Sequence, residues 1–165
     1  MKAMICGGFY LLAITLNAQI MTSPEKTVIG LFVATDQNNW QKVEDSFGDE
    51  VLLDYSSMNG SPAARFSASQ IVASWKTILP GFEHTHHQIG NIQSKEMNEV
   101  ANVSCYGTAS HYLTNEEGNL WTVVGSYNFE LVKKESEWEI VVMKFDFKFQ
   151  DGNTSLPELA IKNVK

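Results

Sequence analysis

Cysteine and positive charge are both scarce in this chain of 165 residues. Its two cysteines cannot make a disulfide framework, so the fold must depend on packing. Twelve Lys and Arg stand against nineteen Asp and Glu, which gives a formal net charge of −7. Because a surface that binds phosphates or anionic lipids needs the opposite balance, we expect neither nucleic acid nor an anionic membrane surface as a partner.

Long hydrophobic runs are also absent, except for one near the N-terminus. Ile5 to Leu16 follow Lys2 without a charge, and Ala18 offers a small residue for cleavage. About twelve apolar residues fall short of the roughly twenty that a membrane-spanning helix needs. We therefore predict a signal peptide over residues 1–18, which makes the chain exported, periplasmic or secreted, with no stable membrane insertion. The alternatives are a membrane anchor and a cytosolic chain with an unusual start.

The rest of the chain, residues 19–165, has no repeat or linker, so we predict a single domain. Its first half is mostly helical in pattern. Ser23-Pro24-Glu25 is a helix start signal, and Ser67 to Gln70 resembles a capping box that opens another helix. Between them we predict a short helix that begins at Asn39 and carries Phe47 inward, and then a short strand over residues 51–55.

After Gly81 the hydrophobic pattern has a period of two, which continues to Gln150 and is typical of strands. Turn residues interrupt it near residues 97–98, 116–119 and 135–136, so we predict hairpins between long antiparallel strands. Helices followed by a meander indicate the α+β class: N-terminal helices packed on one face of a strongly curved sheet.

Small residues mark the inner face of one of these strands. From residue 101 to 113 we expect the odd-numbered side chains to point inward, because side chains alternate along a strand. Cys105, Gly107 and Ala109 fill little of that face, so neighbouring side chains or a ligand can occupy the space. His111 is the polar residue among them. The alternative is a core histidine beneath well-fitting helices.

Two neighbouring strands also carry polar residues that we expect to face this interior. Between residues 83 and 91, an inward Ile89 takes His87 with it, toward His111. On the third long strand, we expect Val124, Ser126, Asn128 and Val132 to share the inner face. A mostly apolar pocket with a few converging polar groups is the usual form of a ligand site.

Metal binding and cysteine catalysis fit the sequence less well. His84 and His86 have a spacing that metal sites use, but they share the face opposite His87, and no acidic residue or cysteine completes a set. We therefore predict no metal. Cys105 and His111 lie six residues apart on one strand, which is about 20 Å and too far for a nucleophile and its base.

Several short motifs occur in a characteristic order between about residues 27 and 150. They are Asp36, Asn39-Trp40, Leu53-Asp54-Tyr55, Thr85 to Gly90, Ser110-His111, Ser126-Tyr127-Asn128, Lys133-Lys134 and Trp138. This ordered set resembles scytalone dehydratase, in the SnoaL-like branch of the nuclear transport factor 2-like (NTF2-like) superfamily. The resemblance implies a cone-shaped half-barrel: a bent mixed or antiparallel sheet around a central pocket that helices close.

The resemblance also implies a chemistry, in which water is eliminated from a hydroxylated cyclic ketone with no cofactor. It implies His87 as the general base and acid, His111 and Asp36 as a hydrogen-bonded pair, and Tyr55 as the group that polarises the carbonyl through a water. The implied substrate contacts are Asn128, Ser126 and Thr35. Thr35 stands where the family has a second tyrosine, and it is too short to replace that phenol.

Proton removal beside a carbonyl needs a base with a pKa near the working pH, which histidine provides. Our leading hypothesis is therefore an exported, cofactor-independent lyase (a dehydratase) or isomerase for a small cyclic hydroxylated or carbonyl compound. The second is a protein of the same fold that binds a small molecule without changing it. The third is an interaction domain that forms a homo-oligomer through the sheet face, with Trp138 and Phe145 to Phe149 exposed.

Overall fold

The computed structural model describes residues 23–164, so the signal peptide that we predict over residues 1–18 lies outside the described part of the chain. Within that part, no helix is both long enough and apolar enough to cross a membrane.

Most helices lie in the first half of the described chain. They are α1 (Pro24–Asp36), α2 (Trp40–Glu44), α3 (Ser56–Asn59), α4 (Ala68–Lys76) and the 3-10 turn η1 (Leu79–Gly81). Ser23 caps α1 by accepting the Lys26 N–H, and Ser67 and Gln70 form a capping box at α4. The helix starts predicted from the sequence are therefore confirmed.

Six strands form one mixed sheet. They are β1 (Phe47–Asp54), β2 (Ala64–Phe66), β3 (His84–Met97), β4 (Val100–Tyr112), β5 (Leu120–Lys134) and β6 (Glu137–Gly152), in the spatial order β2-β1-β6-β5-β4-β3. Only the β1–β6 pair is parallel within the described sheet. The predicted α+β class and the three predicted hairpins are confirmed.

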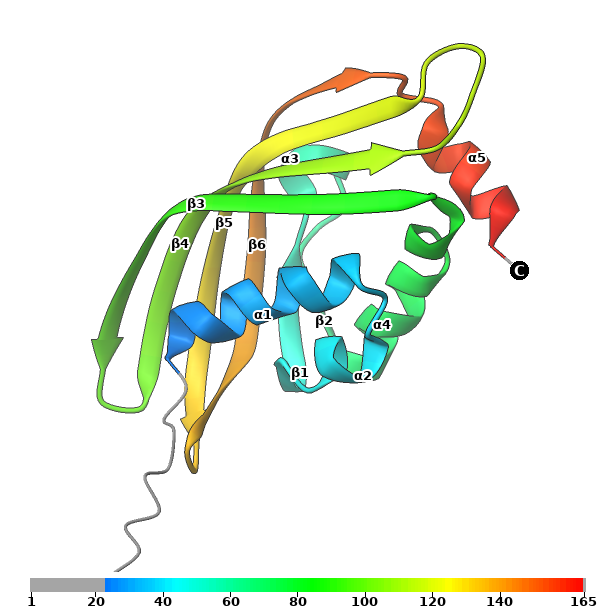
Figure 1. The fold of residues 1–165 in the computed structure, drawn as a ribbon. Helices are drawn as coiled ribbons and strands as arrows, with labels where there is room; N and C mark the ends of the chain where they lie inside the picture. Colours follow the sequence, from blue (N-terminus) through cyan, green and yellow to red (C-terminus); the bar gives the residue numbers. More distant parts are fainter. Residues whose placement is uncertain (1–22, 165) are drawn as a thin grey trace, which may run out of the picture.

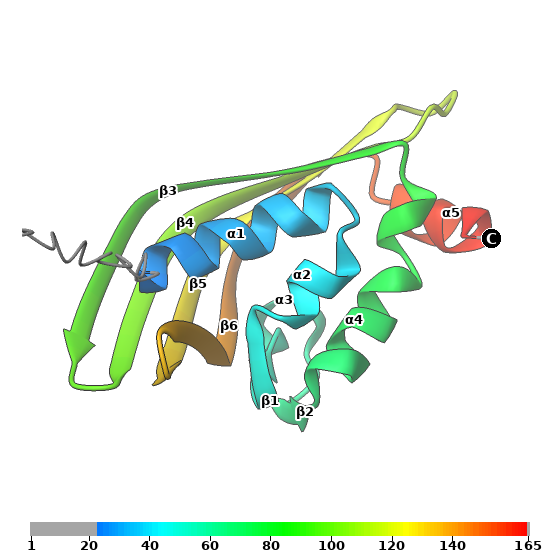
Figure 2. The same ribbon diagram turned by 60° about the horizontal axis from the view of Figure 1, so that its bottom comes forward.

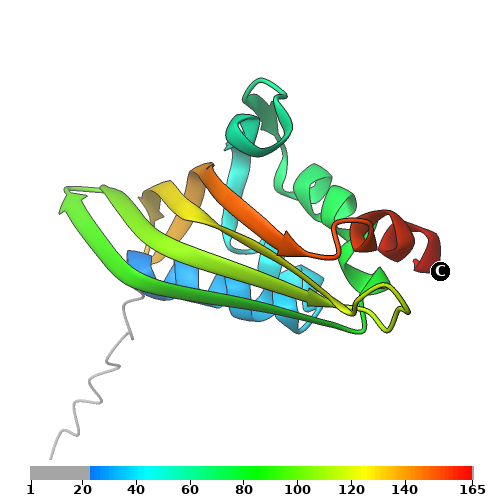
Figure 3. The same cartoon turned by 90° about the horizontal axis from the view of Figure 1, so that it is seen from above.

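The sheet curves around the helices. Figures 1 and 2 show α1, α2 and α4 on the concave side of β3 to β6, and Figure 3 shows the same strands from the other side, with α1 behind them. Register shifts bend the strands: one lies in β3 between Gly90 and Gln93, where Asn91 has a φ of 50°. The result is the cone-shaped half-barrel that the resemblance implies.

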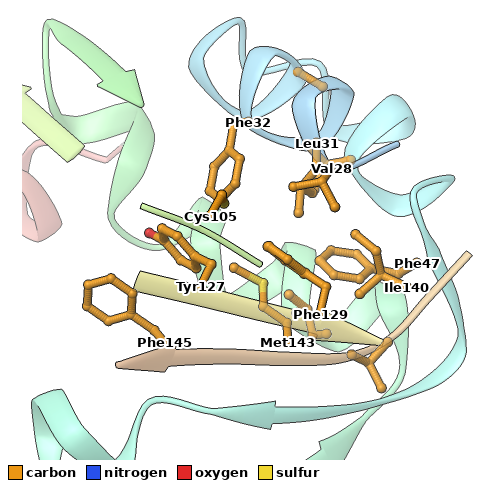
Figure 4. Close-up of a cluster of buried hydrophobic side chains, with 14 of the residues drawn as sticks. Val28, Leu31, Phe32, Phe47, Cys105, Tyr127, Phe129, Ile140, Met143 and Phe145 are labelled. Atoms are coloured by element: carbon orange, nitrogen blue, oxygen red, sulfur yellow. The ribbon is translucent and has the colours of Figure 1, made fainter. Parts of the chain in front are cut away.

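The core lies between α1 and the inner face of the sheet. Val28 and Leu31 of α1 pack with Phe129, Ile140 and Met143 of β5 and β6, and all five are buried (Figure 4). This packing follows from the helical spacing on α1 and the alternation along the strands.

Two aromatic residues that we expected on an exposed sheet face belong to the core instead. Trp138 and Phe145 are only 4% and 2% exposed, because they point inward from β6, whereas Phe149 is 55% exposed. These residues therefore do not form one outer surface, and the homo-oligomer stays a prediction.

One local assignment from the sequence was wrong, and one helix was missed. Phe47 begins β1 rather than ending a helix, although its side chain is buried as expected. The C-terminal helix α5 (Leu156–Asn163) was not predicted. It packs against η1 so closely that a Cβ on Gly81 would lie 1.9 Å from the Ala160 carbonyl oxygen.

Candidate active site

A cavity of about 170 Å³ lies between the helices and the inner face of the sheet. Its walls are mostly aromatic and aliphatic, and the described residues that line it include no charged lysine, arginine, aspartate or glutamate side chain. The polar lining residues are Thr35, Tyr55, His87, His111 and Tyr127. Since an apolar cavity of ~150 Å³ in another protein takes up benzene, this one is large enough for a single six-membered ring with small substituents.

Asp36 and His87 form a hydrogen-bonded pair at the wall of this cavity. The Asp36 Oδ1 atom lies 2.6 Å from His87 Nδ1 and also accepts the Thr85 hydroxyl at 3.0 Å. The other carboxylate oxygen, Oδ2, accepts the backbone N–H of His87 at 2.7 Å. Three hydrogen bonds thus hold one carboxylate against one imidazole.

Local structure explains why these groups meet. Asp36 is the last residue of α1, and α1 runs beside β3, the edge strand of the sheet. An edge strand has backbone N–H groups with no neighbouring strand to accept them. The carboxylate of Asp36 accepts one of these groups, and strand alternation places the side chains of Thr85 and His87 on the same side.

The electrostatics of the pair favour one arrangement of protons. Burial raises the pKa of Asp36, but the hydrogen bonds from the ring and backbone of His87 outweigh it, so this pKa lies below its usual value. A carboxylate at Nδ1 requires a proton on that nitrogen. Neutral His87 therefore carries its lone pair on Nε2, where it can act as a base toward a molecule in the cavity.

The structure corrects the pairing that the resemblance implied for Asp36, because its partner is His87 and not His111. His111 does line the cavity, 5.9 Å from His87 between ring centroids. Its Nδ1 atom lies 3.4 Å from the Trp121 carbonyl oxygen, and its ring contacts the rings of Phe82 and Trp121. Burial, and then the charge on His87, lower the pKa of His111 to about 4, so it is neutral at pH 7.

Tyr55 and Thr35 both reach the cavity, as expected. Tyr55 precedes α3, and its ring packs against Phe145 with a centroid distance of 5.7 Å. Burial raises the pKa of Tyr55, so its phenol stays protonated and can donate a hydrogen bond. Thr35 donates its hydroxyl proton to the Leu31 carbonyl at 2.8 Å. That proton is therefore not available to a substrate.

Ser126 and Asn128 lie on the opposite face of the sheet and do not line the cavity, so our prediction that they face the interior was wrong. Asn128 is exposed and donates to Asp146 Oδ2 at 2.9 Å. The β4–β5 register pairs Cys105 with Tyr127 and Ala109 with Val123, which brings the odd-numbered residues of both strands to the inner face. The even-numbered residues, including Ser126, must then point outward.

Sequence reasoning missed Tyr127, which this register places in the cavity wall. Its ring lies over Gly107 of β4, where a Cβ atom would be 2.4 Å from the ring carbon Cε2. Phe145 uses the space at Gly125 in the same way. The small residues thus make room for rings as well as for a cavity. The run of apolar residues at odd positions from Trp121 to Leu131 was the signal that could have revealed this face.

The remaining histidines lie outside the cavity. His84 and His86 are exposed on the outer side of β3, as the alternation predicts. Between residues 23 and 164, no three side chains of His, Cys, Asp or Glu cluster closely enough to suggest a metal ion.

Comparison with known proteins relates this architecture to a family. The model of the SnoaL-like domain matches residues 26–144. We find no curated protein that matches the chain by sequence.

Solved structures give the same result for the fold. Kfla4162 from Kribbella flavida has 20% identity and a TM-score of 0.74, over 82% of this chain and 93% of its own. A candidate scytalone dehydratase from Novosphingobium aromaticivorans has 19% identity and a TM-score of 0.65, over 78% of this chain and 84% of its own. The hexachlorocyclohexane dehydrochlorinase LinA-type3 from Novosphingobium barchaimii has 9% identity and a TM-score of 0.62, over 79% of this chain and 87% of its own.

At these identities the neighbours establish the fold alone, and the match to the family model covers most of the chain. The protein therefore belongs to the SnoaL-like family and shares the NTF2-like fold of its structural neighbours.

Proposed function

We propose that this protein is a cofactor-independent lyase or isomerase that acts on a small cyclic hydroxylated or carbonyl compound. The observation that carries the proposal is the Asp36–His87 pair, in which the carboxylate holds Nδ1 of an imidazole that lines a cavity large enough for one ring. A carboxylate at Nδ1 holds the imidazole in place and stabilises its protonated form, as general acid–base catalysis requires.

The reaction begins when His87 Nε2 removes a proton from the carbon beside the substrate carbonyl. The electron pair of the broken C–H bond moves onto the carbonyl oxygen, and Tyr55 donates a hydrogen bond to the enolate. In a dehydratase, the enolate then expels a hydroxyl group from the next carbon, and this group takes the proton from His87 and leaves as water. In an isomerase, the substrate has a C=C bond next to the carbon that loses the proton, so the electron pair of the enolate extends over this bond. His87 then returns the proton to the far carbon of the bond, and the double bond moves into conjugation with the carbonyl.

The names of two structural neighbours support an elimination. One is a candidate dehydratase and the other a dehydrochlorinase. Loss of water and loss of hydrogen chloride both remove a proton and a leaving group from adjacent carbons, so both reactions need a base near an apolar ring.

A single substrate tests this proposal. With 3-hydroxycyclohexanone in deuterated buffer, ultraviolet absorbance follows formation of the conjugated enone and NMR follows deuterium entry beside the carbonyl. We expect H87Q to slow both reactions by roughly 10²- to 10⁴-fold and D36N to slow them as well, because the imidazole then loses its partner. The matched control is H86Q, on the outer face of the same strand, which should react at the wild-type rate.

Turnover that is unchanged in H87Q would overturn the assignment of His87. A wild-type protein that binds this ketone but neither exchanges its protons nor eliminates water would overturn the enzymatic proposal.

That second result would favour a protein that binds a small molecule without changing it. The observation behind this alternative is Thr35, whose hydroxyl proton is bonded to Leu31, so that α1 offers no donor for a carbonyl. Bound molecules recovered unchanged from the purified protein after long incubation would support it, provided that H87Q binds them equally well.

A further inference from the structure

The phenol of Tyr127 is a polar group in the cavity wall with no assigned role. The hydrogen bonds found among residues 23–164 include none from the hydroxyl of Tyr127 or of Tyr55, although both residues line the cavity. In the same residues, no fully buried side-chain oxygen or nitrogen lacks a partner. An unpaired phenol must therefore reach open space, and for Tyr127, which is only 6% exposed, that space is the cavity.

Packing holds the Tyr127 ring in one position. One face of the ring has the Cα of Gly107 beneath it, at a site where any larger side chain would collide with the ring. Phe32 and Phe145 contact it with centroid distances of 4.9 Å and 4.7 Å, as Figure 4 shows. A ring confined in this way keeps its hydroxyl directed at one place, which is what a preorganised hydrogen-bond donor needs.

Tyr55 and Tyr127 lie close enough to influence each other. Both rings pack against Phe145. Burial raises the pKa of Tyr127 well above its usual value, and the charge that Tyr55 would carry on ionisation raises it further, as does that of Cys105. Both phenols therefore stay protonated at neutral pH, and each has one proton to donate.

We propose that Tyr127 and Tyr55 together bind the carbonyl oxygen of the substrate, with Tyr127 supplying from β5 the donor that Thr35 cannot supply from α1. This inference rests on the proposed function, because it places the carbonyl beside the carbon from which His87 removes a proton. It also narrows the substrate to a neutral, single-ring carbonyl compound. A carboxylate or phosphate would find no cationic lysine or arginine among the described residues that line the cavity.

The experiment uses cyclohexanone labelled with ¹³C at the carbonyl, which has no leaving group and so reports on binding without elimination. Isotope-edited infrared spectroscopy measures its C=O stretch, whose frequency falls when the oxygen accepts hydrogen bonds. In the wild-type protein we expect a frequency well below that in an apolar solvent. In Y127F the frequency should rise and the affinity fall roughly 2- to 10-fold, the usual effect of one hydrogen bond.

Three further variants make the result specific. Y55F should raise the frequency in the same way, and G107A should do so by displacing the Tyr127 ring without changing a donor. The matched control is Y106F, which removes a phenol from the outer face of β4 and should leave the frequency at the wild-type value.

The outcomes separate this inference from the proposed function. H87Q should keep the low carbonyl frequency, since His87 is no donor to this oxygen, while it loses the exchange of protons. If Y127F and G107A both leave the frequency and the affinity unchanged, Tyr127 does not bind the carbonyl, and the role of His87 is unaffected. If the wild-type protein leaves the frequency at its value in an apolar solvent, neither phenol binds the carbonyl.

Discussion

Acid should destabilise this protein through His111, well before its carboxylates become protonated. Burial and the charge on His87 lower the pKa of His111 from about 6.5 to about 4. Between these two values the unfolded chain binds a proton at this residue and the folded chain does not. The stability that neutral His111 preserves is therefore complete above pH 6.5 and is lost progressively as the pH falls toward 4.

The size of this effect follows from the two pKa values. A difference of one pKa unit corresponds to about 1.4 kcal/mol. A shift from about 6.5 to about 4 therefore lowers the free energy of unfolding by roughly 3 kcal/mol below pH 4, and by roughly 2 kcal/mol at pH 5. Domains of this size are stable by about 5–15 kcal/mol, so the loss at pH 5 is large enough to measure.

Urea unfolding between pH 7.5 and pH 5 tests this prediction on wild type, H111Q and H86Q. H111Q cannot titrate at this position, so its stability should fall by roughly 2 kcal/mol less than that of wild type over this range. H86Q removes an exposed histidine and should follow wild type. Parallel pH profiles for wild type and H111Q would refute the reasoning, because they would show that His111 takes up its proton equally in both states.

Two further predictions concern the ends of the chain. A Cβ on Gly81 would lie 1.9 Å from the Ala160 carbonyl oxygen, so G81A should displace α5 and lower the free energy of unfolding in urea by roughly 1–3 kcal/mol. G30A is the control, because Gly30 lies in α1 with nothing within 4 Å of its Cβ position. Alanine there should stabilise the helix by up to about 1 kcal/mol. If G81A and G30A changed the free energy of unfolding equally, this account of Gly81 would be contradicted. We also propose that residues 1–18 are removed on export, so N-terminal sequencing of protein from the periplasm or medium should begin at Gln19, and a mature protein that keeps Met1 would contradict it.

The strands β3 and β4 could be predicted in detail because each has one face that is clearly more apolar or smaller than the other. Ile89 settled the inward face of β3, and the small residues from Cys105 to Ala109 settled that of β4, so His87 and His111 were placed correctly. In both strands a local pattern was enough, because a side chain two residues away must share the same face.

The face of β5 was assigned wrongly because its inner side contains Gly125. A glycine has no side chain whose polarity could indicate which face of the strand is buried. The apolar residues at the other odd positions favour this face, but it is the pairing with β4, a contact between distant segments, that shows Tyr127 facing inward. The bond between Asp36 and His87 could not be predicted for the same reason. It depends on where α1 ends relative to an edge strand 51 residues further along the chain.

The carboxylate of Asp36 also covers part of the open edge of the sheet. This carboxylate satisfies a backbone N–H on the open rim of the sheet, where an uncapped strand would offer a template for another chain. The carboxylate therefore has a structural use that does not depend on the proposed reaction, because it occupies an N–H group to which a strand of another molecule could otherwise bind.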